Sequence, residues 1–157
     1  MAEYEFLTTW VVGAPIDRVF ALLNDSKAFP EWWKGVTAVE VLEEGGERGV
    51  GELARYSWRS VLPYTLVFDS RVTRVDPPHR IEGQASGELE GVGIWRLFAG
   101  SESTAVVYEW RVRTTKLWMN MWGPLPRPAF VWNHNRVMQQ GGHGLAERLD
   151  AELIVHD

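Results

Sequence analysis

The sequence contains no cysteine, and this absence removes several classes of chemistry at once. Disulfide frameworks, thiolate zinc sites, iron–sulfur clusters and cysteine nucleophiles are all excluded. No uncharged run approaches the roughly 18 residues that a membrane-spanning helix requires, so we expect no stable membrane insertion. Residues 1–5 are acidic where a signal peptide would be basic, which favours a cytoplasmic protein.

Basic residues are fewer than acidic ones: the chain has 16 lysines and arginines against 21 aspartates and glutamates, for a net charge of −5. A chain of this sign repels phosphate backbones, so we expect no nucleic-acid partner. Hydrophobic residues make up 45% and charged residues 24%, which is ordinary for a globular protein and excludes disorder. The length favours one domain covering residues 1–157.

Tryptophan, in contrast, is abundant, with nine residues in the chain. A core of this size does not need nine such large side chains, each with an N–H that requires a partner. We therefore expect some of them to line a cavity or a contact surface, with a heavily aromatic core as the alternative. The nine are Trp10, Trp32, Trp33, Trp58, Trp95, Trp110, Trp118, Trp122 and Trp132.

The first part of the chain predicts a strand followed by two short helices. Residues 4–12 alternate as a half-buried strand does, and the glycine, alanine and proline at 13–15 end it. Proline suits the first turn of a helix, and residues 16–23 then carry apolar side chains at helical spacing. A second short helix is expected near residues 27–34.

The middle of the chain predicts six consecutive short strands, which favour an antiparallel meander and, with the first strand, a sheet of about seven strands. The alternation assigns the two faces: Tyr108 and Trp110 share one parity, and Glu109 and Arg111 share the other. We therefore expect the apolar face to pack inward and the charged face to meet solvent. The six expected strands cover residues 36–42, 52–60, 64–75, 79–86, 89–99 and 104–115.

The last part predicts a long helix from about residue 129 to residue 153. Glycines in its middle weaken the helix by about 1 kcal/mol each relative to alanine, so they indicate a close approach to the sheet or a kink. One apolar stripe follows the helical period through Phe130, His134, Val137, Met138, Gly141, Leu145 and Leu149.

This order of elements resembles the helix-grip fold of the START-like (SRPBCC) superfamily, in its polyketide cyclase/dehydrase-like branch. The resemblance covers essentially the whole chain and implies an α+β fold, in which a curved antiparallel sheet wraps around the long C-terminal helix. The local strings that carry it are APIDRVF at 14–20, FPEWW at 29–33, GVGIW at 91–95, NH at 133–134 and GLAERL at 144–149.

The resemblance also implies a cavity between the sheet and the last helix that takes a small hydrophobic molecule, lipid-like or aromatic and polyketide-like. Small residues on the inward parity, such as Gly83 and Ala85, leave volume there. The alternative is that the aromatic side chains fill this space completely. The expected ligand-binding residues are Tyr56, Trp58, Tyr64, Phe68, Gly93, Trp95, Tyr108, Trp110, Phe130, His134 and Met138.

His134 is the candidate catalytic residue, because a histidine on the apolar stripe has the chemistry of a general acid–base or a handle for a ligand carbonyl. Its alternative is a core histidine that is satisfied by a backbone group or water. No acidic residue shares the inward parity of the central strands, which favours binding over a polyketide cyclase/dehydratase-type reaction. The histidines show no metal-ligand spacing, so we expect neither a metal nor a cofactor.

Residues 117–126 form an uncharged segment that is rich in tryptophan and methionine. Such surfaces adapt to varied partners, so the segment is a candidate lid over the cavity, a contact for a homodimer, or a site that rests on a membrane or a hydrophobic partner, as in a protein-interaction module. Its alternative is a loop that is tucked onto the core.

Overall fold

The computed structural model describes residues 3–59, 65–115 and 127–156. Its sheet has eight strands in the order β2-β3-β4-β5-β6-β7-β1-β8, and every neighbouring pair is antiparallel. The elements are β1 (Glu3–Val12), α1 (Ile16–Leu23), a 3₁₀ turn (Ser26–Ala28), α2 (Phe29–Trp32), β2 (Val36–Glu43), a second 3₁₀ turn (Glu47–Gly49), β3 (Leu53–Trp58), β4 (Leu66–Asp76), β5 (Arg80–Gly87), β6 (Leu89–Ala99), β7 (Thr104–Thr114), α4 (Arg127–Arg148) and β8 (Leu153–His156).

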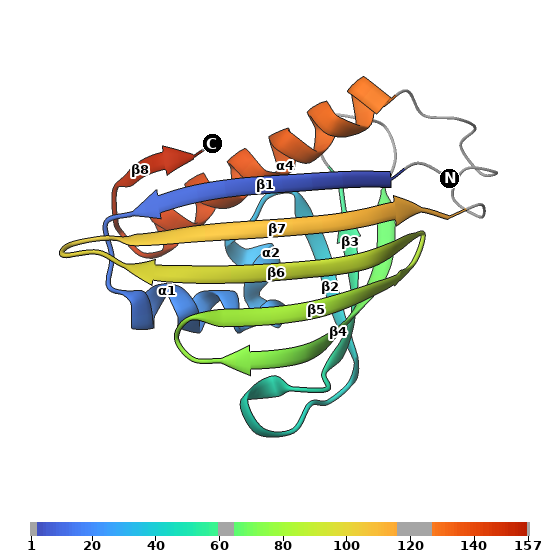
Figure 1. Ribbon diagram of the computed structural model, residues 1–157, viewed down its shortest axis with the longest axis horizontal. Coiled ribbons are helices and arrows are strands. Elements are labelled where there is room, and N and C mark those ends of the chain that lie inside the picture. Colours follow the sequence, from blue (N-terminus) through green and yellow to red (C-terminus); the bar gives the residue numbers. More distant parts are fainter. Residues whose placement is uncertain (1–2, 60–64, 116–126, 157) are drawn as a thin grey trace.

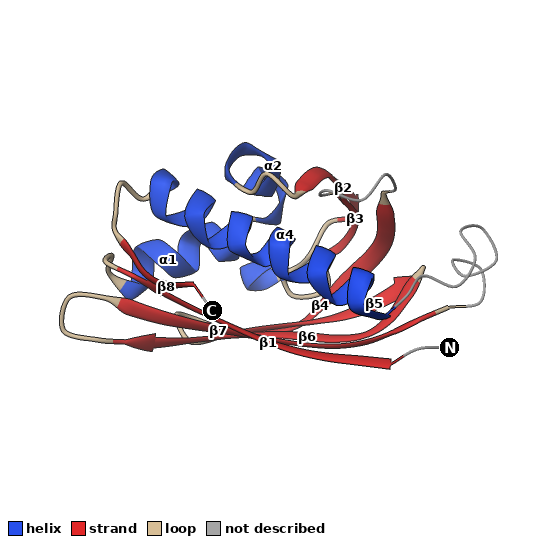
Figure 2. Cartoon of the chain, turned by 90° about the horizontal axis from the view of Figure 1, so that it is seen from above, coloured by secondary structure: helices blue, strands red, loops and turns tan. Residues whose placement is uncertain are grey.

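The helices all lie on one side of the sheet, and α4 runs along the inner face while β2 and β3 curl up beside it (Figures 1 and 2). The expected curved antiparallel sheet around a long C-terminal helix is confirmed. The expected faces are also confirmed, because Phe68, Tyr108 and Trp110 are buried. On the other face, Arg55 pairs with Asp69 at 2.8 Å.

Three glycines allow α4 to approach the tryptophans closely. A Cβ on Gly141 would lie 2.6 Å from the Trp33 ring, and one on Gly142 would lie 2.9 Å from the Trp10 ring. A Cβ on Gly144 would overlap the backbone carbonyl oxygen of Trp32. The glycines therefore reflect a close approach to the aromatic layer, and their cost in helix propensity is offset by this packing.

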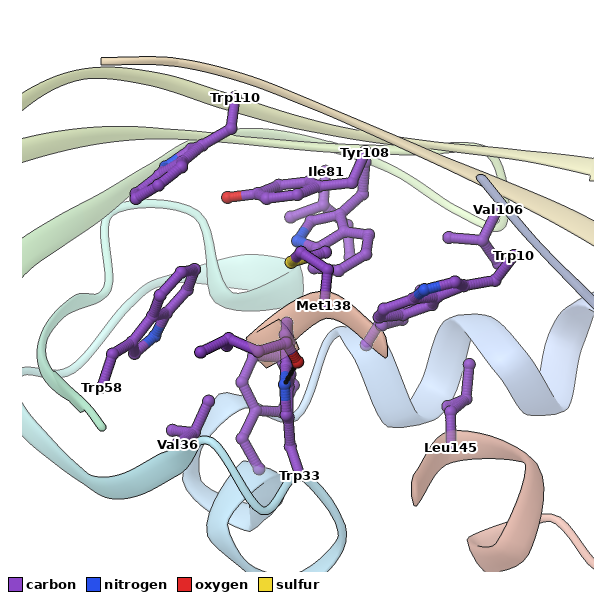
Figure 3. Close-up of a cluster of buried hydrophobic side chains, with 14 of the residues drawn as sticks. Trp10, Trp33, Val36, Trp58, Ile81, Val106, Tyr108, Trp110, Met138 and Leu145 are labelled. Carbon is purple, nitrogen blue, oxygen red and sulfur yellow. Dashed lines mark hydrogen bonds between the residues drawn. The ribbon is translucent and has the colours of Figure 1, made fainter. Parts of the chain in front are cut away.

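Trp33 also forms a hydrogen bond with the helix, since its indole N–H donates to the Val137 carbonyl oxygen at 2.8 Å. Figure 3 shows Trp33 against the α4 segment that carries Met138. The indole thus satisfies its one polar group with a backbone acceptor inside the core.

The prediction of a helix that runs to residue 153 is wrong. The helix ends at Arg148, and Asp150 adopts a left-handed conformation with φ of 51°. The Ala151 N–H donates to the Ala146 carbonyl and the Asp150 N–H to the Glu147 carbonyl, which is the pattern of a Schellman C-cap. The chain then turns back as β8, which pairs with β1 and adds the eighth strand.

We predict that Gly144→Ala lowers the free energy of unfolding by about 1–3 kcal/mol, although alanine is the better helix former. The added methyl group would overlap the Trp32 carbonyl, and that backbone atom cannot rotate away. Urea denaturation monitored by circular dichroism measures the loss.

Gly13→Ala is the control, because the nearest atom to a Cβ there lies 3.7 Å away. Its unfolding free energy should stay within about 0.5 kcal/mol of the wild type. Equal urea midpoints for the Gly144→Ala variant and the wild type would show that α4 does not need the close approach.

Candidate functional site

A cavity of about 80 Å³ lies on the inner face of the sheet, beside the end of α1 and the start of α2. Aromatic side chains from four strands form most of its wall. Seven of the residues expected to bind ligand line it, namely Tyr56, Trp58, Phe68, Gly93, Trp95, Tyr108 and Trp110.

The wall is a connected set of ring contacts. Trp58 stacks on Trp110 with 5.0 Å between ring centroids and meets Phe68 edge-on at 5.4 Å. Trp95 stacks on Tyr108 at 4.0 Å. Because each ring contacts at least one other, the wall has little freedom to collapse into the cavity, and the space persists.

Glycine makes room for a hydroxyl group in this wall. A Cβ on Gly93 would lie 2.6 Å from the Tyr108 hydroxyl oxygen. Because Gly93 has no side chain, the Tyr108 side chain of the neighbouring strand β7 occupies part of the space beside it. Gly83 and Ala85 complete the small-residue side of the lining.

Polar groups gather where the lining reaches the surface. Asn24 is exposed, and the Ser26 hydroxyl donates to a Glu52 carboxylate oxygen at 2.8 Å. The cavity thus has apolar walls and a polar mouth, as most small-molecule sites do.

Both tyrosines of the cavity are neutral phenols at physiological pH. Burial raises the pKa of Tyr56 to about 12, although the hydrogen bond from Ser26 lowers it and Glu52 adds a smaller rise. Burial also raises the pKa of Tyr108, with a further rise from the neighbouring Tyr56. Each hydroxyl is therefore suited to hydrogen bonding rather than to proton transfer near pH 7.

The α4 residues expected at the site lie elsewhere. Phe130, His134 and Met138 are buried but are not part of the cavity lining. His134 stacks on Phe6 with 3.7 Å between ring centroids and on Trp110 at 5.3 Å. The Trp110 ring thus separates the histidine from the cavity that it was expected to serve.

His134 is a neutral core histidine. Its Nδ1 lies 3.3 Å from the Asn135 side-chain oxygen, and its Nε2 is buried without a hydrogen-bond partner among the described residues. Burial lowers its pKa to about 4, against a smaller opposing effect of the Asn135 contact. The histidine is thus buried, as the core alternative requires, but no backbone group satisfies it among the described residues.

Several residues that line the cavity were not predicted from the sequence. They are Leu23, Phe29 and Trp33, together with Asn24, Ser26 and Glu52 at the mouth. The polarity of residues 24–26, close before the buried aromatic Phe29, was the available signal. Two expected features, Tyr64 and segment 117–126, lie outside the described residues.

A larger hollow of about 760 Å³ lies on the opposite, charged face of the sheet. Its arginines are engaged: Arg113 pairs with Glu90 at 2.7 Å and Arg71 with Glu43 at 3.0 Å, while Arg111 pairs with Glu109. Mutual pairing of the charges fits a solvated face better than a site for an anion.

The described part of the chain contains no group of three or more histidine, aspartate or glutamate side chains that could hold a metal ion. Within the same residues, no helix is both long enough and apolar enough to cross a bilayer.

The comparisons with known proteins agree with this architecture. A family model described as polyketide cyclase / dehydrase and lipid transport matches residues 5–150. No protein among the curated ones matches the chain. Among solved structures, a protein from Thermus thermophilus is 19% identical, with a TM-score of 0.76, over 93% of this chain and 97% of that one.

Two further solved structures extend the likeness. A START superfamily protein from Mycobacterium smegmatis is 15% identical, with a TM-score of 0.74, over 93% of this chain and 97% of that one. The Zhui aromatase/cyclase from Streptomyces sp. R1128 is 19% identical, with a TM-score of 0.66, over 94% and 92%. At these identities the structural likeness concerns the fold.

We predict that His134 makes the fold labile to acid. Its pKa falls from 6.5 when exposed to about 4 when folded, so only the unfolded chain takes up the proton as the pH drops below 6.5. The stability that neutral His134 contributes is present above pH 6.5 and is lost toward pH 4. Between pH 7 and 4.5 the free energy of unfolding should therefore fall by about 2 kcal/mol from this group alone.

The matched variant is His134→Phe, which keeps a ring between Phe6 and Trp110 and removes the titration. Urea denaturation at pH 7 and 4.5 measures both proteins, and the difference between their losses isolates His134 from the carboxylates. Equal losses would show that His134 already carries a proton in the folded protein near pH 6.

Proposed function

Since this chain belongs to the polyketide cyclase/dehydrase and lipid transport family, we propose that it binds a small hydrophobic ligand in the cavity on the inner face of its sheet. The observation that supports the proposal most strongly is the cavity itself, a space of about 80 Å³ kept open within an aromatic wall. In a chain with nine tryptophans, space of this kind is scarce.

The energetics favour an apolar occupant. Residual cavity volume in a core costs about 24 cal/mol per Å³, so this space costs on the order of 2 kcal/mol if it stays empty. An apolar ligand recovers contacts with the facing rings and removes its own surface from water. Its size is limited, because the cavity is about half as large as the roughly 150 Å³ cavity that accepts benzene in an engineered protein.

A cyclase or dehydratase reaction is the alternative, and it requires an acid or base in contact with the ligand. The described lining offers Tyr56 and Tyr108, whose raised pKa values oppose proton transfer at neutral pH. It also includes Glu52, which accepts a hydrogen bond from the Ser26 hydroxyl at the mouth, and Glu82, which pairs with Arg80. His134 lies behind Trp110, with a pKa of about 4. The arrangement therefore supports binding over catalysis.

The test is calorimetric titration of the purified protein with benzene and toluene, combined with native mass spectrometry for co-purified small molecules. Ala85→Leu adds bulk to the lining and should weaken the binding of toluene on the order of tenfold, since overpacking a confined site costs about 1–3 kcal/mol. The thermal midpoint of each variant checks that it folds.

Val92→Leu is the matched control, because Val92 is 41% exposed on the outer face of β6. The same side chain is created there, outside the cavity, and ligand affinity should not change. Equal affinities in Ala85→Leu, Val92→Leu and the wild type would place the ligand elsewhere, and no binding of either compound would contradict the proposal.

A further inference from the structure

We propose that the cavity binds a compact organic cation, an amine whose apolar body lies among the aromatic side chains and whose ammonium group lies at the mouth beside Glu52. The inference rests on the proposed binding function and names the class of ligand. Three features of the described lining carry it: a carboxylate without an ion pair, polar groups at the mouth that are turned to accept hydrogen bonds, and aromatic rings whose planes cross.

The charge of the described lining is negative. Glu52 and Glu82 are its carboxylates, and no lysine, arginine or histidine belongs to it. Glu82 is neutralised, because nitrogens of Arg80 and Arg74 lie 3.1 Å and 3.7 Å from its oxygens. Glu52 forms no ion pair with any described residue, and its side-chain partner is the neutral hydroxyl of Ser26. The half-buried Glu52 therefore leaves one uncompensated negative charge at the mouth.

The polar groups at the mouth direct their hydrogens toward the protein. A carboxylate only accepts hydrogen bonds, so the Ser26 hydroxyl donates its one hydrogen to the Glu52 oxygen 2.8 Å away. The Asn24 side-chain nitrogen donates to the Arg48 carbonyl oxygen at 3.3 Å. A ligand head group that donates is therefore served better here than one that accepts. An ammonium group donates three hydrogen bonds, and those to a carboxylate are strengthened by both charges.

The aromatic wall also favours a cation. The face of an aromatic ring carries negative partial charge, which attracts a cation within about 6 Å of the ring centroid. The planes of Trp33 and Trp95 cross at 73°, and those of Trp58 and Phe68 cross at 75°. Figure 3 shows Trp33, Trp58 and Trp110 around a common space. Because the planes cross, a ligand in the cavity meets ring faces as well as edges, as in an aromatic cage.

The same features disfavour an acid. A carboxylate ligand would lose its water, find no cation in the described lining and be repelled by Glu52. A neutral alcohol keeps a hydrogen bond to Glu52 but lacks the attraction between opposite charges. The affinities of ligands with one apolar body should therefore fall from ammonium to alcohol to carboxylate. A volume of about 80 Å³ limits that body to one ring.

The experiment compares benzylamine, benzyl alcohol and benzoate by calorimetry at pH 7, where the amine is protonated. The wild type should bind benzylammonium about 3- to 10-fold more tightly than benzyl alcohol, with benzoate weakest. Glu52→Gln keeps an acceptor for Ser26 and removes the charge. It should weaken benzylammonium by about 3- to 10-fold, leave benzyl alcohol within about twofold and strengthen benzoate.

Glu102→Gln is the matched control, because Glu102 is an exposed residue of the turn between β6 and β7, outside the cavity lining. The substitution removes the same charge from the protein, and the three affinities should equal those of the wild type. The thermal midpoint of each variant checks that it folds.

Equal affinity of the wild type for benzylammonium and benzyl alcohol, or equal affinity of the wild type and Glu52→Gln for benzylammonium, would overturn the cation inference. Tighter binding of benzoate than of benzylammonium would overturn it too. The binding function stands in each case if Ala85→Leu weakens the probe that binds, and also if toluene binds and benzylammonium does not. If benzene, toluene and the three probes all fail to bind, the proposed function and the inference fall together.

Discussion

The contact between Trp33 and α4 is the constraint on which the rest of the structure depends. The indole N–H of Trp33 reaches the Val137 carbonyl at 2.8 Å, and Gly141 leaves the space that the ring occupies. A side chain at Gly141 would meet the Trp33 ring and one at Gly142 would meet the Trp10 ring, so either would displace α4 from the aromatic rings on which it packs. Among the described residues, tryptophan rings rather than α4 side chains line the cavity, which lies beside the end of α1 and the start of α2.

This displacement separates the ionisable group of the core from the binding space. His134 is held between Phe6 and Trp110, where burial keeps it neutral, and the described lining of the cavity on the far side of Trp110 contains phenols and no histidine. The position of one indole ring thus separates the helix histidine from the cavity without any change in the architecture of the fold.

Much of this architecture could be predicted from the sequence, because alternation and helical spacing are local patterns. The parity of β7 identified Tyr108 and Trp110 as inward, and the stripe on α4 identified its buried residues. The C-terminal end of α4 could not be predicted, because the left-handed residue of its cap is Asp150 rather than the usual glycine. The polar mouth of the cavity could not be predicted, because Ser26 and Glu52 are 26 residues apart in the sequence and only the fold brings them together.

For the proposed binding function, the cost of leaving polar groups of the cavity unpaired should discriminate among ligands more than the attraction of the apolar walls does. Apolar walls give similar free energies to toluene, anisole and phenol, since their buried surfaces are alike. A ligand without an acceptor, however, shields the Tyr108 hydroxyl from water and returns no hydrogen bond to it. Discrimination of this kind needs no strong bond, because a loss of about 1–3 kcal/mol for the wrong ligand suffices. In the proposed site, the tyrosines would therefore add specificity, whereas the tryptophans would supply most of the apolar contact.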